Sequence, residues 1–248
     1  MARKTEQTGL RTVITLLLLL CLLPNRLQAQ AEELEYKMDL GAAIGTCFYL
    51  GDANSTPYAH MSIMGGLMAR RILNPTMAVK MNIAMGHLNG TMDGFIPVDP
   101  LSGNIEGGVP TKVDFSRNVL DIGAQFEMNF WGFGFGGGYK DLKRITPYAL
   151  AGIGMTIGMG GGASACGALC LPVGVGVKYK LKPRLNIGFE WTMRFTTSDR
   201  LDATPEGTTQ LAHPYGIKSV GLKNKDCYNF TMVYLTYEIM PKLRKCNN

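Results

Sequence analysis

The sequence predicts an all-β fold, an eight-stranded antiparallel transmembrane β-barrel of the outer-membrane type, and three observations support it. Apolar residues recur at every second position over long segments, glycine is abundant, and short connections alternate with long ones. A period of two residues is typical of β-strands, because successive side chains point to opposite faces. The 31 glycines among 248 residues disfavour helices, because an interior Gly costs about 1 kcal/mol relative to Ala.

The first segment has the pattern of a secretory signal peptide. Basic residues precede an uncharged apolar run at residues 12–23, and small residues at Ala29 and Ala31 follow with the spacing of a cleavage site. The apolar run is too short for a helix that spans a membrane. We therefore expect a cleaved signal peptide at residues 1–29 and a barrel domain at residues 30–248.

Eight later segments carry strand periodicity. Five alternate clearly, and their apolar rows are, in chain order, Tyr36-Met38-Leu40-Ala42-Ile44, Met77-Val79-Met81-Ile83-Met85, Leu120-Ile122-Ala124-Phe126-Met128-Phe130, Leu171-Val173-Val175-Val177-Tyr179 and Leu185-Ile187-Phe189-Trp191-Met193-Phe195. Three more alternate weakly, at residues 62–73, 146–157 and 228–239. Each strand would be roughly 10–14 residues long, whereas strands of soluble proteins have about 5–6 and a membrane-crossing strand needs about 9–11.

The connections favour an outer-membrane barrel, because short turns on one side and long loops on the other are typical of that class. Short connections fall at residues 73–75 and 181–184, with a medium one at 132–144, and long ones at 51–58, 86–111, 158–168 and 197–226. A soluble β-sandwich or lipocalin-like barrel also alternates. The aromatic residues that end the apolar rows and the polar opposite rows favour the membrane barrel over both.

Two details of this prediction leave alternatives. The segment 112–119 is out of phase with Leu120, which we interpret as a bulge near the outer rim, with a ten-stranded barrel as the alternative. The uncharged stretch 145–177 contains many glycines and is expected to form two strands and a loop. Its glycine row near residues 148–155 is expected to face the interior.

Few motifs indicate catalysis or cofactor binding. Gly132, Gly134 and Gly137 match the letters of a dinucleotide fingerprint, but a strand follows in place of the required helix, so we expect no cofactor. The three histidines, His60, His87 and His213, lack paired metal-ligand spacing, so no metal site is expected. His60 and Ser62 share a strand face, as a lipid-modifying enzyme would require, but no third orienting group is identifiable.

Five cysteines follow the signal peptide: Cys47, Cys166, Cys170, Cys227 and Cys246. Cys47 and Cys227 fall near the outer ends of the first and last strands, which are neighbours in a closed barrel, so a disulfide between them is the candidate pairing. Cys166 and Cys170 share one loop and are a second possible pair. The alternative is that all are free thiols.

The polar rows predict a filled interior. Lys80, Glu127, Lys178, Glu190 and Arg194 all fall on the row opposite the apolar one. An eight-stranded barrel is just wide enough to be filled by side chains, and buried charges must pair. We therefore expect an interior ion network and no solute pore.

Basic residues gather at the expected short-turn end, which faces the periplasm in this topology. The eleven are Arg70, Arg71, Lys140, Lys143, Arg144, Lys180, Lys182, Arg184, Lys242, Arg244 and Lys245. This basic rim fits contact with lipid headgroups, where each basic residue contributes about 1 kcal/mol near an anionic surface. It also fits a docking surface for a periplasmic partner. The net charge of +6 over the whole chain is mild, whereas a nucleic-acid-binding protein carries a strong charge clustered on a face or stripe, so no nucleic-acid partner is expected.

Several strings resemble the PorG-like family of small outer-membrane β-barrels. They are residues 34–41, 48–54, 172–181, 184–195, 198–202, 214–219 and 224–226, and the resemblance covers essentially the whole chain after the signal peptide. The resemblance implies an outer-membrane component of a type IX secretion apparatus that associates with a periplasmic ring-forming lipoprotein. It supplies no catalytic residues, and the Cys-containing loop at residues 158–170 departs from the family pattern.

We therefore expect a non-enzymatic outer-membrane protein with both termini in the periplasm and a structural or anchoring function. The segment 132–144 and the tail from Pro241 are the candidate partner surface, and outer-membrane lipid is the other expected contact. No small-molecule substrate is expected. The alternatives are a passive envelope-stabilising barrel without a dedicated partner and a lipid-modifying enzyme.

Overall fold

The computed structural model describes residues 36–51, 56–95, 111–134, 142–161, 165–197, 201 and 226–241. The chain divides into two units, Met1–Glu33 and Leu34–Asn248, and only the second contains described residues. The expected signal peptide therefore lies outside the described residues. Within the described residues, no helix has the length and apolar character needed to cross a membrane.

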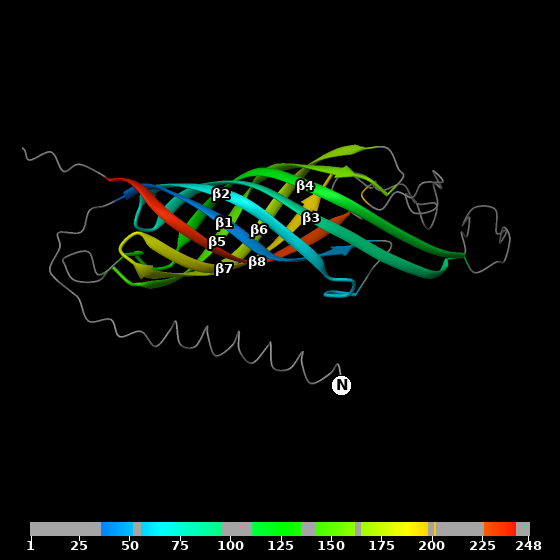
Figure 1. The fold of residues 1–248 in the computed structure, drawn as a ribbon, viewed down its shortest axis with the longest axis horizontal. Helices are drawn as coiled ribbons and strands as arrows, with labels where there is room; N and C mark the ends of the chain where they lie inside the picture. Colours follow the sequence, from blue (N-terminus) through cyan, green and yellow to red (C-terminus); the bar gives the residue numbers. More distant parts are fainter. Residues whose placement is uncertain are drawn as a thin grey trace, which may run out of the picture. The chain divides into compact units, whose positions relative to one another are not determined.

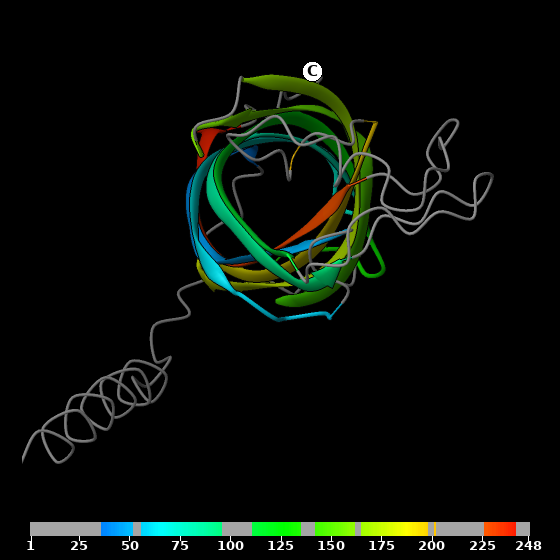
Figure 2. The same ribbon diagram turned by 90° about the vertical axis from the view of Figure 1, so that its right-hand side faces the viewer.

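Eight strands form one closed antiparallel barrel (Figure 1). The strands are β1 Tyr36–Leu50, β2 Ser62–Asn74, β3 Met77–Phe95, β4 Thr111–Asn129, β5 Ile145–Met159, β6 Cys166–Lys182, β7 Leu185–Thr196 and β8 Cys227–Pro241. Each strand pairs with the next one in the chain, and β8 pairs with β1 to close the ring. Figure 2 shows this ring end-on. The predicted eight-stranded antiparallel barrel is confirmed.

The ten-stranded alternative is wrong, and the phase break between residues 112–119 and Leu120 is not a bulge; the register shift of the β3–β4 ladder lies further towards the rim, between Met92 and Phe95. β4 runs without interruption through residues 111–129, and its register against β3 is continuous from Met128 to Val113. Phe115 and Val119 are buried inside the barrel. The sequence loses phase here because the inward row carries Phe115 and Val119 on either side of the buried Arg117, so the apolar residues change rows while the backbone keeps its alternation.

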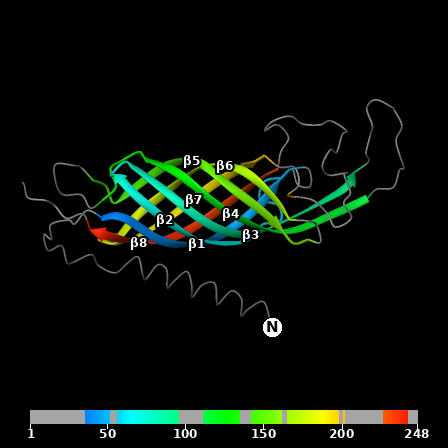
Figure 3. The same cartoon turned by 90° about the horizontal axis from the view of Figure 1, so that it is seen from above.

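The two ends of the barrel differ. At one end, here called the turn end, lie the connections β2–β3, β4–β5 and β6–β7, and Tyr36 pairs with Pro241 where β1 begins and β8 ends. The opposite end, here called the loop end, carries the other four connections. β3 and β4 are the longest strands, with 19 residues each, and extend beyond their neighbours at the loop end (Figure 3). β1 therefore begins and β8 ends at the turn end.

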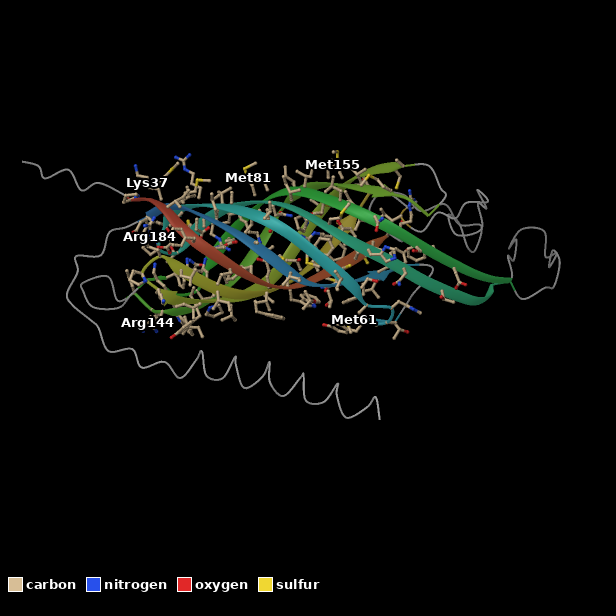
Figure 4. All side chains as sticks on the ribbon, viewed as in Figure 1. Lys37, Met61, Met81, Arg144, Met155 and Arg184 are labelled. Carbon is tan, nitrogen blue, oxygen red and sulfur yellow. The ribbon has the colours of Figure 1, made fainter. Side chains whose placement is uncertain are left out.

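The outer wall is apolar, as the alternation predicts. Ile63, Ile153 and Met81 expose 76%, 69% and 63% of their surface, and the labelled Met81 and Met155 project away from the wall in Figure 4. The inward row of β5 includes Gly152 and Gly154, so the predicted interior position of this glycine row is confirmed. An apolar outer surface of this extent is what a lipid bilayer covers.

Glycines on the inward rows make room for tyrosine rings. A Cβ on Gly188 would lie 2.3 Å from the ring of Tyr234, and one on Gly176 would lie 2.5 Å from the ring of Tyr148. Real Cβ atoms do not approach so closely, so any other residue would displace these rings. The high glycine content is thus explained in part by the packing of large aromatic side chains inside a narrow barrel.

Candidate functional site

A network of buried charges fills the barrel between its centre and the turn end. Glu127 of β4 is its hub: its carboxylate lies 2.8 Å from Arg70 Nε, 3.3 Å from Lys178 Nζ and 3.7 Å from Lys80 Nζ. Lys80 Nζ also lies 2.6 Å from Glu190, and Arg70 donates to Asp39 at 3.0 Å. All six side chains are at most 3% exposed. Charges at this depth must be paired, because an unpaired one would carry a desolvation penalty of several kcal/mol.

Two tyrosines extend this hub network across the interior. Tyr148 donates a hydrogen bond of 2.7 Å to Glu190, and its hydroxyl lies 3.1 Å from that of Tyr234. The rings contribute as well, because the Arg70 guanidinium lies 5.3 Å from the centre of the Tyr234 ring and Lys178 Nζ lies 5.0 Å from the centre of the Tyr148 ring. Such cation–π contacts strengthen when they are removed from water.

Arg194 belongs to a second cluster, centred on Asp121. Arg194 Nε lies 3.1 Å from Asp121 Oδ2, and Tyr228 donates to the same oxygen at 2.8 Å. Asn82 donates to Asp121 Oδ1 at 2.8 Å, and the Arg194 guanidinium lies 4.1 Å from the centre of the Phe230 ring. The structure therefore places all five predicted interior residues inside the barrel, but Lys80, Glu127, Lys178 and Glu190 form one network and Arg194 another.

The buried charges of the described residues are balanced. The buried basic residues are Arg70, Lys80, Arg117, Lys178, Lys180 and Arg194, and the buried acidic residues are Asp39, Asp121, Glu127, Glu190, Asp226 and Glu238. These ion pairs link strands that are far apart in sequence. Among the described residues, no group of three or more His, Cys, Asp or Glu side chains could hold a metal ion.

Two residues assigned to the basic rim are in fact interior residues. Arg70 is 2% exposed and pairs with Asp39 and Glu127. Lys180 is 8% exposed and its Nζ lies 2.8 Å from Glu238. Both assignments are wrong for the same physical reason: Arg70 and Lys180 occupy inward positions of β2 and β6, so a place near the strand end does not bring them to the surface.

Other members of the predicted rim do reach the surface at the turn end. Arg71, Lys143 and Lys182 are exposed, while Arg144 and Arg184 are half-buried. Lys37, which is not among the eleven predicted rim residues, is also exposed, and Figure 4 shows Lys37, Arg144 and Arg184 at this end. We call these six residues the basic end. Lys140, Lys242, Arg244 and Lys245 lie outside the described residues.

Aromatic side chains support the basic end. The Arg184 guanidinium lies 4.5 Å from the centre of the Tyr237 ring and 5.1 Å from that of Tyr36. Lys143 Nζ lies 4.7 Å from the centre of the Trp131 ring. Tyrosine and tryptophan with neighbouring basic residues are typical of the boundary between lipid tails and headgroups.

The predicted disulfide between Cys47 and Cys227 is absent, and both thiols are free. Cys47 pairs in register with Phe230, and Cys227 pairs with Leu50. The two cysteines are therefore three residues apart in register, which also places them on opposite faces of the wall. Cys166 and Cys170 are not joined either, because they lie four residues apart on one strand, about 13 Å at the usual rise per residue, beyond the reach of a disulfide.

The histidines occupy unequal environments. His60 lies in a turn before β2, and no hydrogen bond between His60 and Ser62 is present among the described residues. His87 of β3 instead contacts Ser116 and Asn118 of β4. Neither of these partners could be found from the sequence, because the pairing of β3 with β4 spans a long loop. His213 lies outside the described residues.

Comparisons with known proteins give structural likenesses of low sequence identity. Neisserial surface protein A has a TM-score of 0.49 and 10% identity, over 82% of this chain and 97% of that chain. A major outer membrane protein from Thermus thermophilus has a TM-score of 0.46 and 10% identity, over 82% and 99%. Ail, the attachment invasion locus protein of Yersinia pestis, has a TM-score of 0.44 and 11% identity, over 83% and 99%.

No curated protein matches the chain. A family described only as a domain of unknown function, DUF6089, matches residues 11–248. Because this match covers nearly the whole sequence, including every strand of the barrel, the chain belongs to the DUF6089 family.

Proposed function

We propose that this protein is an outer-membrane barrel that serves as a structural anchor for a periplasmic partner. The membrane setting is supported by the apolar outer wall, which is exposed on every strand from β1 to β8. Outer-membrane barrels have short turns on the periplasmic side and longer loops outside. The turn end then faces the periplasm.

A structural role is favoured over transport because the interior is occupied by side chains. From the turn end inward, the pair Lys180–Glu238, the hub network and the Asp121 cluster follow one another along the barrel. At the loop end, Leu201 is fully buried and donates its backbone N–H to Asp226, whose carboxylate also accepts from Tyr49. At the turn end, the centre of the Phe133 ring lies 5.2 Å from Lys178 Nζ. Because side chains fill the described part of the interior at these levels, we expect no solute to pass through the barrel.

The observation that carries the anchoring role is the basic end. Every exposed or half-buried charged residue that the structure describes at the turn end is basic, whereas the acidic residues Asp39 and Glu238 of the same region are buried in ion pairs. A surface with one sign of charge steers and orients an oppositely charged partner. The resemblance to the PorG-like family makes a ring-forming lipoprotein of a type IX secretion apparatus the specific partner to test.

The experiment is cross-linking in intact cells, followed by purification through an affinity tag on the tail after Pro241. We expect a stoichiometric periplasmic lipoprotein with the native barrel. The variant Arg71→Gln/Lys143→Gln/Lys182→Gln/Arg184→Gln should lose this complex while the barrel remains folded, as judged by a heat-dependent gel shift. Asp114→Asn, an exposed charge change at the loop end, is the matched control and should retain the complex.

A passive envelope-stabilising barrel is the second candidate, favoured by the stacking of Arg184 and Lys143 on aromatic rings. In that case the basic end binds lipid headgroups. The native barrel would then be recovered alone, and the fourfold variant would reduce the amount of barrel in the membrane without the loss of any protein complex. That result would refute the anchoring proposal.

A further inference from the structure

The outer wall changes from apolar to polar near the loop end of β3 and β4, the two strands that Figure 3 shows extending beyond the others. On β3 the outward row runs through Met81, Ile83 and Met85, all exposed, and then reaches His87 and Asn89. On β4 the outward row runs through Ile122 and Leu120 and then reaches Asn118 and Ser116. The polar residues on these two neighbouring strands therefore lie together, directly beyond the apolar belt.

Three of these side chains form a continuous hydrogen-bonded chain. His87 pairs in register with Asn118, and Asn89 pairs with Ser116. His87 Nδ1 lies 2.9 Å from Asn118 Oδ1, and His87 Nε2 lies 3.0 Å from Ser116 Oγ. An amide oxygen can only accept, so Nδ1 carries the proton. Nε2 is then the acceptor for the Ser116 hydroxyl, which is the arrangement that a general base needs to activate a serine.

We propose that Ser116, His87 and Asn118 form a serine hydrolase site on the outside of the barrel, which acts on carboxylic esters of membrane lipids. Ser116 is the nucleophile and His87 the general base. Asn118 is a positioning residue, because it fixes the imidazole in the required tautomer and orientation.

The reaction is an acyl transfer to serine and then to water. Ser116 Oγ attacks the ester carbonyl carbon while its proton moves to His87 Nε2. The bond between that carbon and the alcohol oxygen breaks, and the alcohol leaves with the proton from His87. Water then attacks the acyl-serine and gives a proton to His87, the acid departs, and the proton returns to Ser116. Ester and water have become acid and alcohol.

Asn89 is the candidate donor for the oxyanion of this reaction. It lies opposite Ser116 in the ladder, at a distance of about 5 Å between Cβ atoms for such pairs. Its Oδ1 accepts a hydrogen bond of 3.4 Å from Ser62 Oγ, which directs the amide NH2 group away from Ser62. An asparagine side chain in this role stabilises the charge that develops on the carbonyl oxygen.

The position of the site selects the substrate class. The acyl chain of a membrane lipid would lie along Met85, Ile83 and Leu120, and its ester group would stand at the level where the wall becomes polar. A glycerophospholipid and an acylated saccharolipid both offer such an ester. The choice of membrane lipids as the substrate class rests on the proposed membrane location, whereas the reactivity of the Ser116 hydroxyl does not.

The first experiment tests the nucleophile in detergent-folded full-length protein. A fluorophosphonate probe should label the wild type at Ser116, as located by peptide mass spectrometry, and should not label Ser116→Ala. His87→Ala should reduce the labelling rate by about 100-fold or more, the usual effect of losing a general base. Thr91→Val, on the same outward row of β3, is the matched control and should label normally. An unlabelled wild type would overturn the proposal, even if the protein anchors a partner as proposed above.

The second experiment tests the substrate in vesicles. Phosphatidylethanolamine with a labelled acyl chain, and separately an acylated saccharolipid, are reconstituted with the wild type and the variants. Release of fatty acid from one or both, lost in Ser116→Ala, supports the proposal and identifies the source. Asn118→Ala should lower kcat more than it changes KM, and Asn118→Asp should restore kcat. Release that is equal in Ser116→Ala and the wild type, or absent from both lipids, would refute a lipid esterase.

Discussion

Removal of the Glu127 carboxylate tests whether the hub network stabilises the barrel. Glu127→Gln keeps the shape of the side chain but leaves Arg70, Lys80 and Lys178 around a neutral amide. Arg70 keeps Asp39 at 3.0 Å and Lys80 keeps Glu190 at 2.6 Å. Lys178 has no second carboxylate within 4.0 Å among the described residues, so the uncompensated charge falls on it.

The expected loss follows from that single unpaired lysine. Lys178 is 3% exposed, and breaking a buried ion pair by removing one partner costs about 3–5 kcal/mol. Glu127→Gln should therefore lower the free energy of unfolding by about this amount. The double variant Glu127→Gln/Lys178→Met removes the unpaired charge and should recover more than half of the loss, since both partners are then uncharged.

The assay is reversible urea unfolding of the barrel in lipid vesicles, followed by the fluorescence of Trp131 and Trp191, the two tryptophans of the chain. Asp114→Asn, an exposed charge change, is the control and should change the free energy of unfolding by less than about 0.5 kcal/mol. A loss below about 1 kcal/mol for Glu127→Gln, or a double variant no more stable than the single one, would refute the reasoning.

Two further predictions concern packing and thiols. Gly188→Ala places a Cβ within 2.3 Å of the Tyr234 ring and should lower the free energy of unfolding by about 1–3 kcal/mol in the same assay. A Cβ at Gly167 meets nothing within 4 Å, so Gly167→Ala is the control and should change stability little. Equal effects of the two substitutions would contradict the packing explanation. Cys47 and Cys227 lie on opposite faces of the wall, so a non-reducing digest should contain no peptide that links them. Because Cys47 is fully buried, a maleimide should modify it only after the barrel unfolds. A linked peptide would show that the register of β1 against β8 is wrong.

The sequence alone predicts the barrel, and it predicts which row of side chains faces inward wherever the alternation is clear. Lys80, Glu127, Lys178 and Glu190 follow directly from it. Lys180 could have been placed inside by the same rule, because it shares the inward row of β6 with Lys178. Arg70 could not, because β2 alternates weakly around Gly65 and Gly66, and only the pairing with Asp39 decides which of the two adjacent arginines faces inward.

Long-range register limited the rest of the prediction. Cys47 and Cys227 do lie on neighbouring strands, as expected, but their offset of three residues is set by the whole β1–β8 ladder and not by either segment alone. The contact of His87 with Ser116 and Asn118 depends in the same way on the register of β3 against β4. That register joins residues on either side of the long connection 96–110, and the sequence carries no local signal that would fix the register.

One property of the wall connects these observations. Towards the loop end the usual polarity of the barrel is reversed: Leu88 and Phe115 face inward and are buried, while their chain neighbours His87 and Ser116 face outward. The reversal explains why the segment 112–119 looks out of phase, because its apolar residues fill the interior above the Asp121 cluster. It also explains why a serine, a histidine and an asparagine stand together outside. Once the wall leaves the lipid its outward rows face water and are polar, and the proposed hydrolase site uses the first polar positions beyond that boundary.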